Sequence, residues 1–229
     1  NDFINNMTHE FKTPISSISL AAQMLNDASV RKSPEMMQKV STVITDETKR
    51  LRFQVEKVLQ MSMFDRQKAS LRIEEVDANV IIYNVVNTFK LKVEQYGGSL
   101  TANLDAMDAI VNVDEMHFTN VIFNLLDNAV KYRSDERPLN LTVTTSDQSD
   151  ENLKITIADN GIGIRKDDLK KIFEKFYRVS TGNRHDVKGF GLGLAYVHKL
   201  INDMGGSISV ESEYNSGTKF IIILPLSKN

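Results

Sequence analysis

The two short sequences Asp159-Asn160-Gly161-Ile162-Gly163-Ile164 and Gly189-Phe190-Gly191-Leu192-Gly193-Leu194 decide the fold expected for the second half of the chain. They hold five of the eleven glycines. Glycine has no Cβ, so a ligand can approach its backbone closely, and two such clusters predict two walls of one pocket. The second cluster runs into apolar residues with helical spacing, from Ala195 to Ile201. This places a helix N-terminus, which favours phosphate, beside the glycines.

A helix expected over Met116 to Tyr132, with Asp114 as its N-cap, carries a row of polar side chains. Their spacings of four, three and one residues place them on one face or its edge. Carboxamides and an ammonium in such a row could hold hydrated Mg²⁺ and phosphate oxygens, because Mg²⁺ takes few protein ligands. A polar stripe on a surface helix is the alternative. The row consists of Asn124, Asn128, Lys131 and Tyr132.

The segment between the glycine clusters contains Phe173 and Phe176, followed by a polar loop from Ser180 to Lys188. The loop has the composition of a lid that closes over a ligand. For the two phenylalanines, ordinary core packing is the simplest interpretation, and shaping of the pocket is a secondary one.

The composition indicates a globular protein with room for two domains in 229 residues, 41% of them hydrophobic and 25% charged. A net charge of -2 with interspersed signs gives no basic footprint, so nucleic acid is not an expected partner. The absence of cysteine excludes disulfides and thiolate metal sites. The longest apolar run, Phe220 to Leu226, is far shorter than the roughly 20 residues that span a bilayer. We therefore expect no membrane contact by this stretch.

The first 66 residues have the pattern of a helical hairpin. One helix is expected over residues 2–26 and a second from Pro34 to about Asp65, joined by a loop over Asn26 to Ser33. A hairpin with one apolar stripe cannot bury it alone, so we predict a homodimer that forms a four-helix bundle. In the first helix the stripe is expected at Ile4, Met7, Phe11, Ile15, Ile18, Ala22 and Leu25.

On this heptad His9 falls farthest from the stripe, beside Glu10. A solvated surface histidine is the simplest interpretation. Three neighbours, of which Pro14 is the third, favour a catalytic role for His9 instead. Glu10 could hold one imidazole nitrogen and leave the other nucleophilic, and Thr13 follows one turn later on the same face. Pro14 costs a helix about 3 kcal/mol or more, which a purely structural helix has little reason to carry.

From Leu71 the periodicity changes to alternating strands and helices, so we expect a hinge over residues 67–73 and an α/β domain over 74–229. The predicted fold class is multi-domain, α plus α/β. Strands are expected at 71–76, 99–104, 110–113, 139–145, 153–158, 207–212 and 219–224, and a helix at 79–95, in addition to those named above.

The motifs in order resemble the core of a sensor histidine kinase. They are Thr8-His9-Glu10-Phe11-Lys12-Thr13-Pro14, then Asn124 to Tyr132, Asp159 to Ile164, Phe173 to Phe176, Gly189 to Leu194 and Gly217-Thr218. The resemblance covers nearly the whole chain. It implies a dimerisation and histidine phosphotransfer domain, followed by an α/β sandwich of the ATP-binding type found in gyrase, chaperones and MutL.

The resemblance also implies roles for individual residues. His9 would accept the phosphoryl group from ATP, Glu10 would be its activating base, and Thr13 would act in dephosphorylating the partner regulator. Asn128 would bind Mg²⁺, and Asp159 would accept a hydrogen bond from the adenine amino group. The other residues implied at the nucleotide are Asn124, Lys131, Tyr132, Gly161, Gly163, Ile164, Phe176, Arg178, Lys188, Gly189, Gly191, Leu192, Gly193 and Thr218.

Phe190 departs from the family pattern, which usually has a small residue there, and this affects lid packing. Arg178, Arg184 and Lys188 are equal candidates for contacting phosphate from the lid. The implied partner is a cognate response regulator, and the implied location is the cytoplasmic portion of a membrane-anchored protein. Two other functions stay open at this point: an ATP-driven conformational clamp, which would not need His9, and an inactive interaction scaffold.

Overall fold

The computed structural model describes residues 2–66, 71–149, 151–179 and 191–227. Within these, the side chains of residues 2–7, 9–10, 52–54 and 56–66 are not described. The chain divides into two compact units, a helical one up to residue 70 and one that begins at Leu71. This confirms the two-part fold class, while the exact domain limits and the hinge over 67–73 stay predictions. None of the described helices is long and apolar enough to cross a membrane.

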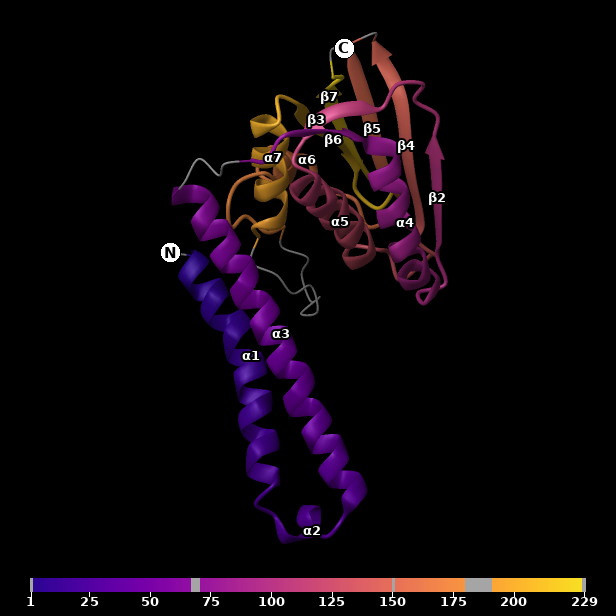
Figure 1. Cartoon of the computed structure of the whole chain (residues 1–229). Helices are drawn as coiled ribbons and strands as arrows, with labels where there is room; N and C mark the ends of the chain where they lie inside the picture. The colour runs from indigo at the N-terminus through magenta and orange to yellow at the C-terminus, as the bar shows by residue number, and fades with distance from the viewer. Residues whose placement is uncertain (1, 67–70, 150, 180–190, 228–229) are drawn as a thin grey trace. The chain divides into compact units, whose positions relative to one another are not determined.

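The first unit is a helical hairpin (Figure 1). Helix α1 (Asp2–Met24) passes through Pro14 and is followed by α2 (Ala28–Arg31) and α3 (Pro34–Arg66). The four-residue helix α2 interrupts the expected loop. Asp27 caps it by accepting a 2.8 Å hydrogen bond from the Ser29 nitrogen. Its Val30 is buried with Ala21 and Val40, so α2 closes the turn of the hairpin with an apolar contact.

The contact between α1 and α3 covers only part of the predicted stripe. Ala21 is buried in it with Val40, whereas Ile15 is 52% exposed and Ala22 is exposed as well. The apolar stripe of α1 is thus wider than the strip that one neighbouring helix covers. The expectation that Ile15 and Ala22 are covered in a four-helix bundle concerns two copies of the chain and stays a prediction.

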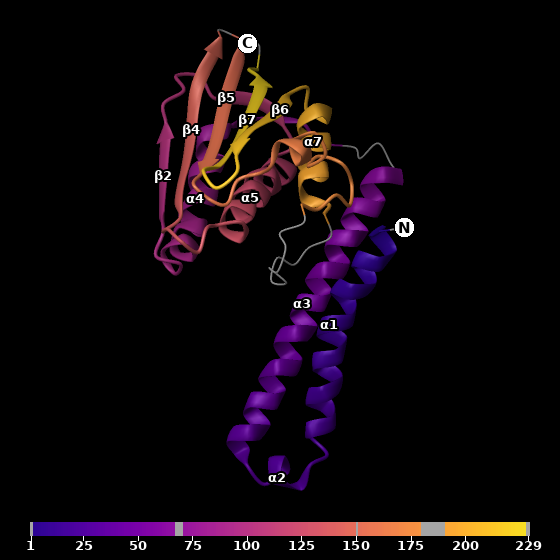
Figure 2. The same cartoon turned by 180° about the vertical axis from the view of Figure 1, so that it is seen from behind.

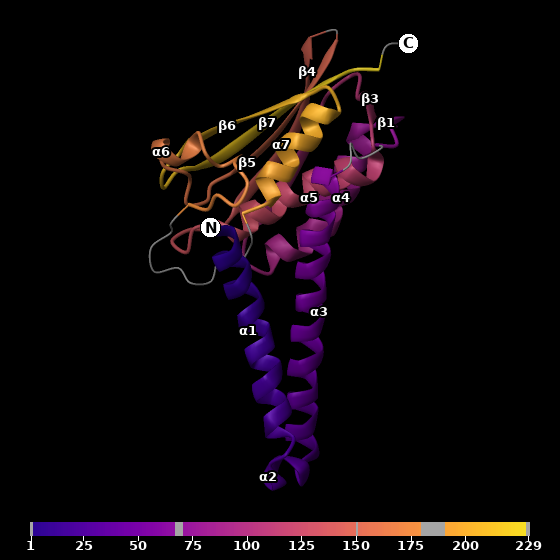
Figure 3. The same cartoon turned by 90° about the vertical axis from the view of Figure 1, so that its left-hand side faces the viewer.

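The second unit is a five-stranded sheet with helices on one face (Figures 2 and 3). The strand order is β2-β4-β5-β7-β6, in which β2 runs parallel to β4 and the other pairs are antiparallel. The strands are β2 (Ser99–Leu104), β4 (Asn140–Ser149), β5 (Asn152–Asp159), β6 (Ser207–Glu213) and β7 (Gly217–Pro225). Alternate residues of β5 and β7 are buried, which is the period expected for a sheet covered on one side.

Helices α4 (Ala78–Glu94), α5 (Glu115–Lys131) and α7 (Gly193–Asp203) cover the sheet. Helix α6 (Lys166–Leu169) is a single turn that was not predicted. A small antiparallel sheet of β1 (Glu74–Asp77) and β3 (Ile110–Val113) lies before α5, and β1 begins three residues later than expected.

Asp114 joins two parts of this unit. Its Oδ1 accepts a 3.0 Å hydrogen bond from the His117 nitrogen and so caps α5, as predicted. Its Oδ2 accepts a 2.9 Å bond from the Arg72 nitrogen. The side chain is buried, and each oxygen has a main-chain donor. The start of α5 is thus fixed to the segment that precedes β1.

Candidate functional site: a carboxylate at the end of a central strand

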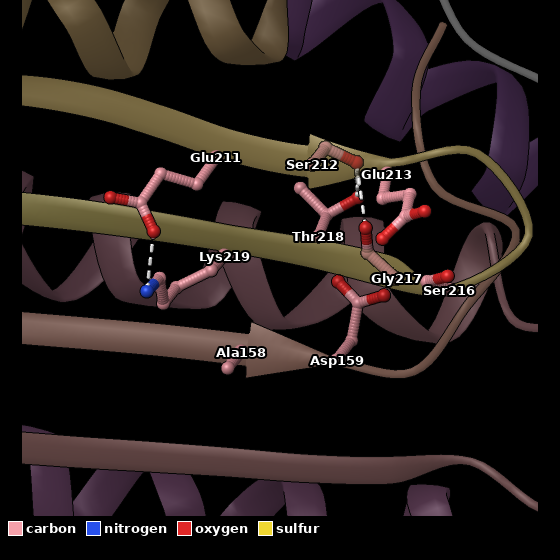
Figure 4. A pocket seen from close by; sticks show the side chains of 9 residues that line it. All are labelled: Ala158, Asp159, Glu211, Ser212, Glu213, Ser216, Gly217, Thr218 and Lys219. Carbon is pink, nitrogen blue, oxygen red and sulfur yellow. Dashed lines mark hydrogen bonds and ion pairs between the residues drawn. The ribbon is translucent and has the colours of Figure 1, made fainter.

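Asp159 is the last residue of β5, and its carboxylate points toward the start of β7 (Figure 4). Oδ1 accepts a 2.8 Å hydrogen bond from the Gly161 nitrogen, and the Thr218 nitrogen is a second main-chain donor. Burial raises the pKa of this carboxyl from 3.8 to about 6, and the two hydrogen bonds oppose the rise. The strand end therefore presents a half-buried acceptor whose pKa is about 6.

A cavity of about 400 Å³ opens beside this carboxylate. Two hydroxyls in its lining lie side by side: Ser212 Oγ is 3.0 Å from Thr218 Oγ1 and donates to the Gly217 carbonyl over 2.7 Å (Figure 4). Ser212 Oγ also accepts a 2.9 Å bond from the Ile164 nitrogen. The cavity is lined by Ala158, Asp159, Glu211, Ser212, Glu213, Ser216, Gly217, Thr218 and Lys219. The predicted residues Asp159 and Thr218 thus line one cavity.

The turn that follows Asp159 is held from both sides. Ile162 donates from its nitrogen to the Tyr132 carbonyl at the end of α5, over 3.0 Å. Its carbonyl accepts a 2.7 Å bond from the Asn215 nitrogen in the turn between β6 and β7. Gly163 has φ +66°, and a Cβ there would lie 2.0 Å from the Glu213 carbonyl oxygen. The close approach of the β6–β7 turn therefore already requires glycine at this position.

The predicted polar row on α5 lies on its half-exposed face, because its partly exposed members alternate with the buried Leu125, Leu126, Ala129 and Val130. Asn124 Nδ2 donates to the Asn120 carbonyl over 2.7 Å. Lys131 Nζ lies 5.7 Å from the centre of the Tyr132 ring. Burial raises the pKa of Tyr132, and the charge of Arg178 partly offsets this rise. Arg178 therefore acts electrostatically on the end of α5, as a site residue near Tyr132 would.

The residues around the start of α7 form a third part of the candidate site. Helix α7 begins at Gly193, after the buried Leu192, which confirms a helix N-terminus beside the second glycine cluster. A Cβ on Gly193 would lie 3.4 Å from Asn124 Oδ1, so this helix start adjoins the α5 row. The Phe176 nitrogen donates to the Gly191 carbonyl over 2.9 Å, and both residues have positive φ, +67° and +68°.

Several predicted residues cannot be placed in this geometry. Lys188 and Gly189 lie outside the described residues, as do the side chains of His9 and Glu10, although both latter residues belong to α1. Thr13 is exposed on the same helix. Ser212 and Arg137, which both bind the turn after Asp159, were not predicted. The alternation of β6 could have indicated Ser212 as an inward-facing residue, but Arg137 belongs to no motif.

The oxygen donors described at the site fit hydrated Mg²⁺. Among the described residues, no three His, Cys, Asp or Glu side chains gather in a way that could hold a metal ion. Asn128 offers one carboxamide oxygen on the half-exposed face of α5. An ion that keeps most of its waters and takes further oxygens from phosphate fits such a site.

Comparison with protein families gives two matches. Residues 113–228 match the histidine kinase-, DNA gyrase B- and HSP90-like ATPase family, and residues 1–67 match the His kinase A (phospho-acceptor) domain. The chain belongs to the sensor histidine kinases. The two matched stretches correspond to the two compact units, the hairpin with His9 and the sheet with Asp159.

Among relatives of this kinase core, the sensor protein RprX of Bacteroides fragilis is 68% identical over 229 residues, which are 100% of this chain and 44% of RprX. The chain thus spans less than half of that relative. Full-length ShkA in complex with AMPPNP shares the fold, with TM-score 0.73, 23% identity and coverage of 98% of this chain and 46% of ShkA. So does histidine kinase ThkA in complex with response regulator protein TrrA, with TM-score 0.72, 23% identity and coverage of 99% and 62%.

Proposed function

We propose that this chain binds ATP in the cavity beside Asp159 and transfers the γ-phosphoryl group to His9. The observation that carries the proposal is the half-buried Asp159 carboxylate at the end of β5, which accepts from main-chain nitrogens and lies in the lining of a cavity. A carboxylate in this setting accepts a hydrogen bond from the adenine amino group but offers none to a keto oxygen. ATP would therefore be selected over GTP.

In the transfer, a ring nitrogen of His9 forms the bond to the γ-phosphorus while the bond to the β–γ bridging oxygen breaks and ADP leaves. Glu10 takes the imidazole proton. Phosphoryl transfer of this kind depends mainly on positioning and on neutralising charge. The row on α5 supports both, since Lys131 supplies a cation and Asn124 adjoins the start of α7. Asn128 would hold Mg²⁺, which when bound neutralises phosphate charge.

The partner that receives the phosphoryl group is proposed to be an aspartate on a response regulator, since ThkA forms a complex with such a protein. The kinase core itself is proposed to dimerise through the hairpin. Large apolar side chains exposed there support this: they are Ile15, Leu20, Met24, Met36, Met37, Val43 and Val55. We place the core on the cytoplasmic side of the membrane, where ATP is supplied.

The reverse activity, dephosphorylation of the regulator, is proposed to use Thr13. Its hydroxyl is exposed one turn beyond His9 and could orient a water toward a docked phospho-aspartate. Thr13→Ala keeps a good helix former, so labelling of His9 should survive while regulator dephosphorylation slows. Equal dephosphorylation rates for the variant and the parent would exclude this role.

The test of the kinase proposal is incubation with γ-labelled ATP. We expect acid-labile, base-stable label on the parent and none on His9→Gln, with ATP binding unchanged in that variant. Label on another residue of His9→Gln would contradict the assignment of the acceptor. The clamp alternative makes the opposite prediction, because ATP hydrolysis without protein label would then be seen in both proteins.

A further inference from the structure

Arg137 forms an unusual set of contacts in the second unit. It lies between the end of α5 and the start of β4, and its guanidinium donates only to main-chain carbonyls in the contacts that are described. Nε donates to the Asn160 carbonyl over 2.8 Å. Nη2 donates to the Gly161 carbonyl over 2.8 Å and to the Asn215 carbonyl over 2.5 Å. The single Nε hydrogen and both Nη2 hydrogens are thus used.

These three carbonyls belong to two loops that meet at the nucleotide cavity. Asn160 and Gly161 form the turn directly after Asp159, and Asn215 lies in the turn between β6 and β7. The two loops are also joined by the bond from the Asn215 nitrogen to the Ile162 carbonyl. The chain around Arg137 adds a further tie: Asn160 Nδ2 donates to the Pro138 carbonyl over 3.0 Å, and its Oδ1 accepts from the Asn140 nitrogen over 2.7 Å.

The fork of Arg137 acts on Asp159 through the backbone. The Gly161 nitrogen that binds Asp159 Oδ1 belongs to the same turn as the two carbonyls that Arg137 holds. The pKa of Asp159 is governed by burial and by its two main-chain donors, and the guanidinium is not among its causes. Because one side chain reaches three carbonyls in two loops, the arrangement requires the planar, several-donor geometry of the guanidinium.

We propose that Arg137 is a positioning residue for adenine recognition: it clamps the turn after Asp159 to the β6–β7 turn and so fixes the orientation of the Asp159 carboxylate. This inference rests on the proposed ATP site. Its consequence is specific, because a loosened turn should weaken the contact to the base and leave contacts to the triphosphate intact.

The test measures displacement of a fluorescent ATP analogue by ATP and by GTP from the whole chain. In Arg137→Ala we expect ATP affinity to fall about tenfold, the size of a lost charge-assisted hydrogen bond. GTP affinity should change little, so the ratio of ATP affinity to GTP affinity should decrease. Arg137→Lys keeps the charge but not the fork, and it should behave like the alanine variant. It also supplies the same test if Arg137→Ala does not fold.

The matched control is Arg133→Ala. Arg133 donates to the Val130 carbonyl over 2.9 Å and stacks 3.9 Å from the Tyr96 ring centre, and neither of these contacts involves the two loops. It should keep the parent's ATP and GTP affinities. Hydrogen exchange without nucleotide gives a second readout: the amides of Ile162 and Asn215 should exchange faster in both Arg137 variants, while those of buried α5 residues stay protected.

Three outcomes would overturn the inference. They are equal loss of ATP and GTP affinity, unchanged ATP affinity, and full restoration by lysine, which would assign the effect to charge. Failure of the parent to bind ATP would instead contradict the proposed function, so the two failures are distinguishable.

Discussion

The Gly161 nitrogen donates a 2.8 Å hydrogen bond to Asp159 Oδ1, yet the pKa of this carboxyl stays near 6 rather than at its ordinary 3.8. The cost of burying the charge exceeds the gain from the main-chain donors. Between pH 3.8 and about 6 the folded chain binds more protons at this residue than the unfolded chain does. The free energy of unfolding therefore falls as pH rises through this window.

The first prediction is that Asp159→Asn stabilises the nucleotide-free protein while weakening ATP binding. A difference of about two pH units between the pKa values corresponds to at most about 3 kcal/mol at about pH 7.5. Urea unfolding at this pH should show the gain, and at about pH 4 the variant and the parent should converge. A difference in unfolding free energy that does not change with pH would contradict this explanation.

The second prediction compares two glycines with nearly the same φ. Gly97 has φ +67° and no atom within 4 Å of the position that a Cβ would take, whereas at Gly163, with φ +66°, a Cβ would lie 2.0 Å from the Glu213 carbonyl oxygen. Gly97→Ala should cost only backbone strain, about 1–2 kcal/mol. Gly163→Ala should cost about 1–3 kcal/mol more, because the β6–β7 turn must move. Equal midpoints of thermal unfolding for the two variants would refute the steric argument.

The third prediction concerns Glu47, which lies between Ile44 and Leu51 along the packed side of α3. Its Oε1 forms an ion pair with Arg50 over 3.7 Å, whereas its Oε2 is buried and has no hydrogen-bond partner among the described residues. Glu47→Met keeps length and helix propensity, so it should raise the free energy of unfolding by about 1 kcal/mol. Glu35→Met is the control, because Glu35 forms a solvent-exposed ion pair with Lys39. This variant should lower the free energy of unfolding by only a few tenths of a kcal/mol. Destabilisation by Glu47→Met would contradict this prediction and show that the ion pair with Arg50 outweighs the cost of the unpaired Oε2.

The fourth prediction tests the dimer. Ile15 is 52% exposed on the hairpin, and Leu91 is 71% exposed on α4 of the other unit. Ile15→Arg places a charge in the proposed four-helix contact and should convert the dimer to a monomer, whereas Leu91→Arg should not. The molar mass of each protein, measured by light scattering at several concentrations, shows whether it is a monomer or a dimer. A monomeric parent would contradict dimerisation, and a dimeric Ile15→Arg would place the contact elsewhere.

Much of the fold was predictable because its local signals agree with the tertiary structure. Asp114 and Pro34 start helices as expected, and the strand alternation located β5 and β7 within one or two residues. The heptad of α1 identifies an apolar stripe that includes Ile15, but periodicity cannot show which part of the stripe α3 covers and which part stays exposed on one chain. Helix α2 is too short for any periodicity, and only the burial of Val30 explains it.

The candidate site likewise contains residues that the sequence could predict and residues that it could not. Residues with a motif, such as Asp159 and Gly193, lie where the glycine clusters and the helix start placed them. Arg137 could not be found from the sequence, because its partners are carbonyls of residues 23, 24 and 78 positions away. Any residue type has a carbonyl, so such contacts leave no trace in the pattern of side chains.

The shared carboxylate of Asp114 also determines where the ATP-binding unit can be cut from the rest of the chain. Its Oδ2 accepts from the Arg72 nitrogen, two residues before β1. A fragment that starts at the first strand would leave a buried oxygen without its donor, at a cost of about 1–3 kcal/mol. An excised unit should therefore begin at Leu71 or earlier, although residues 71–73 have no regular secondary structure.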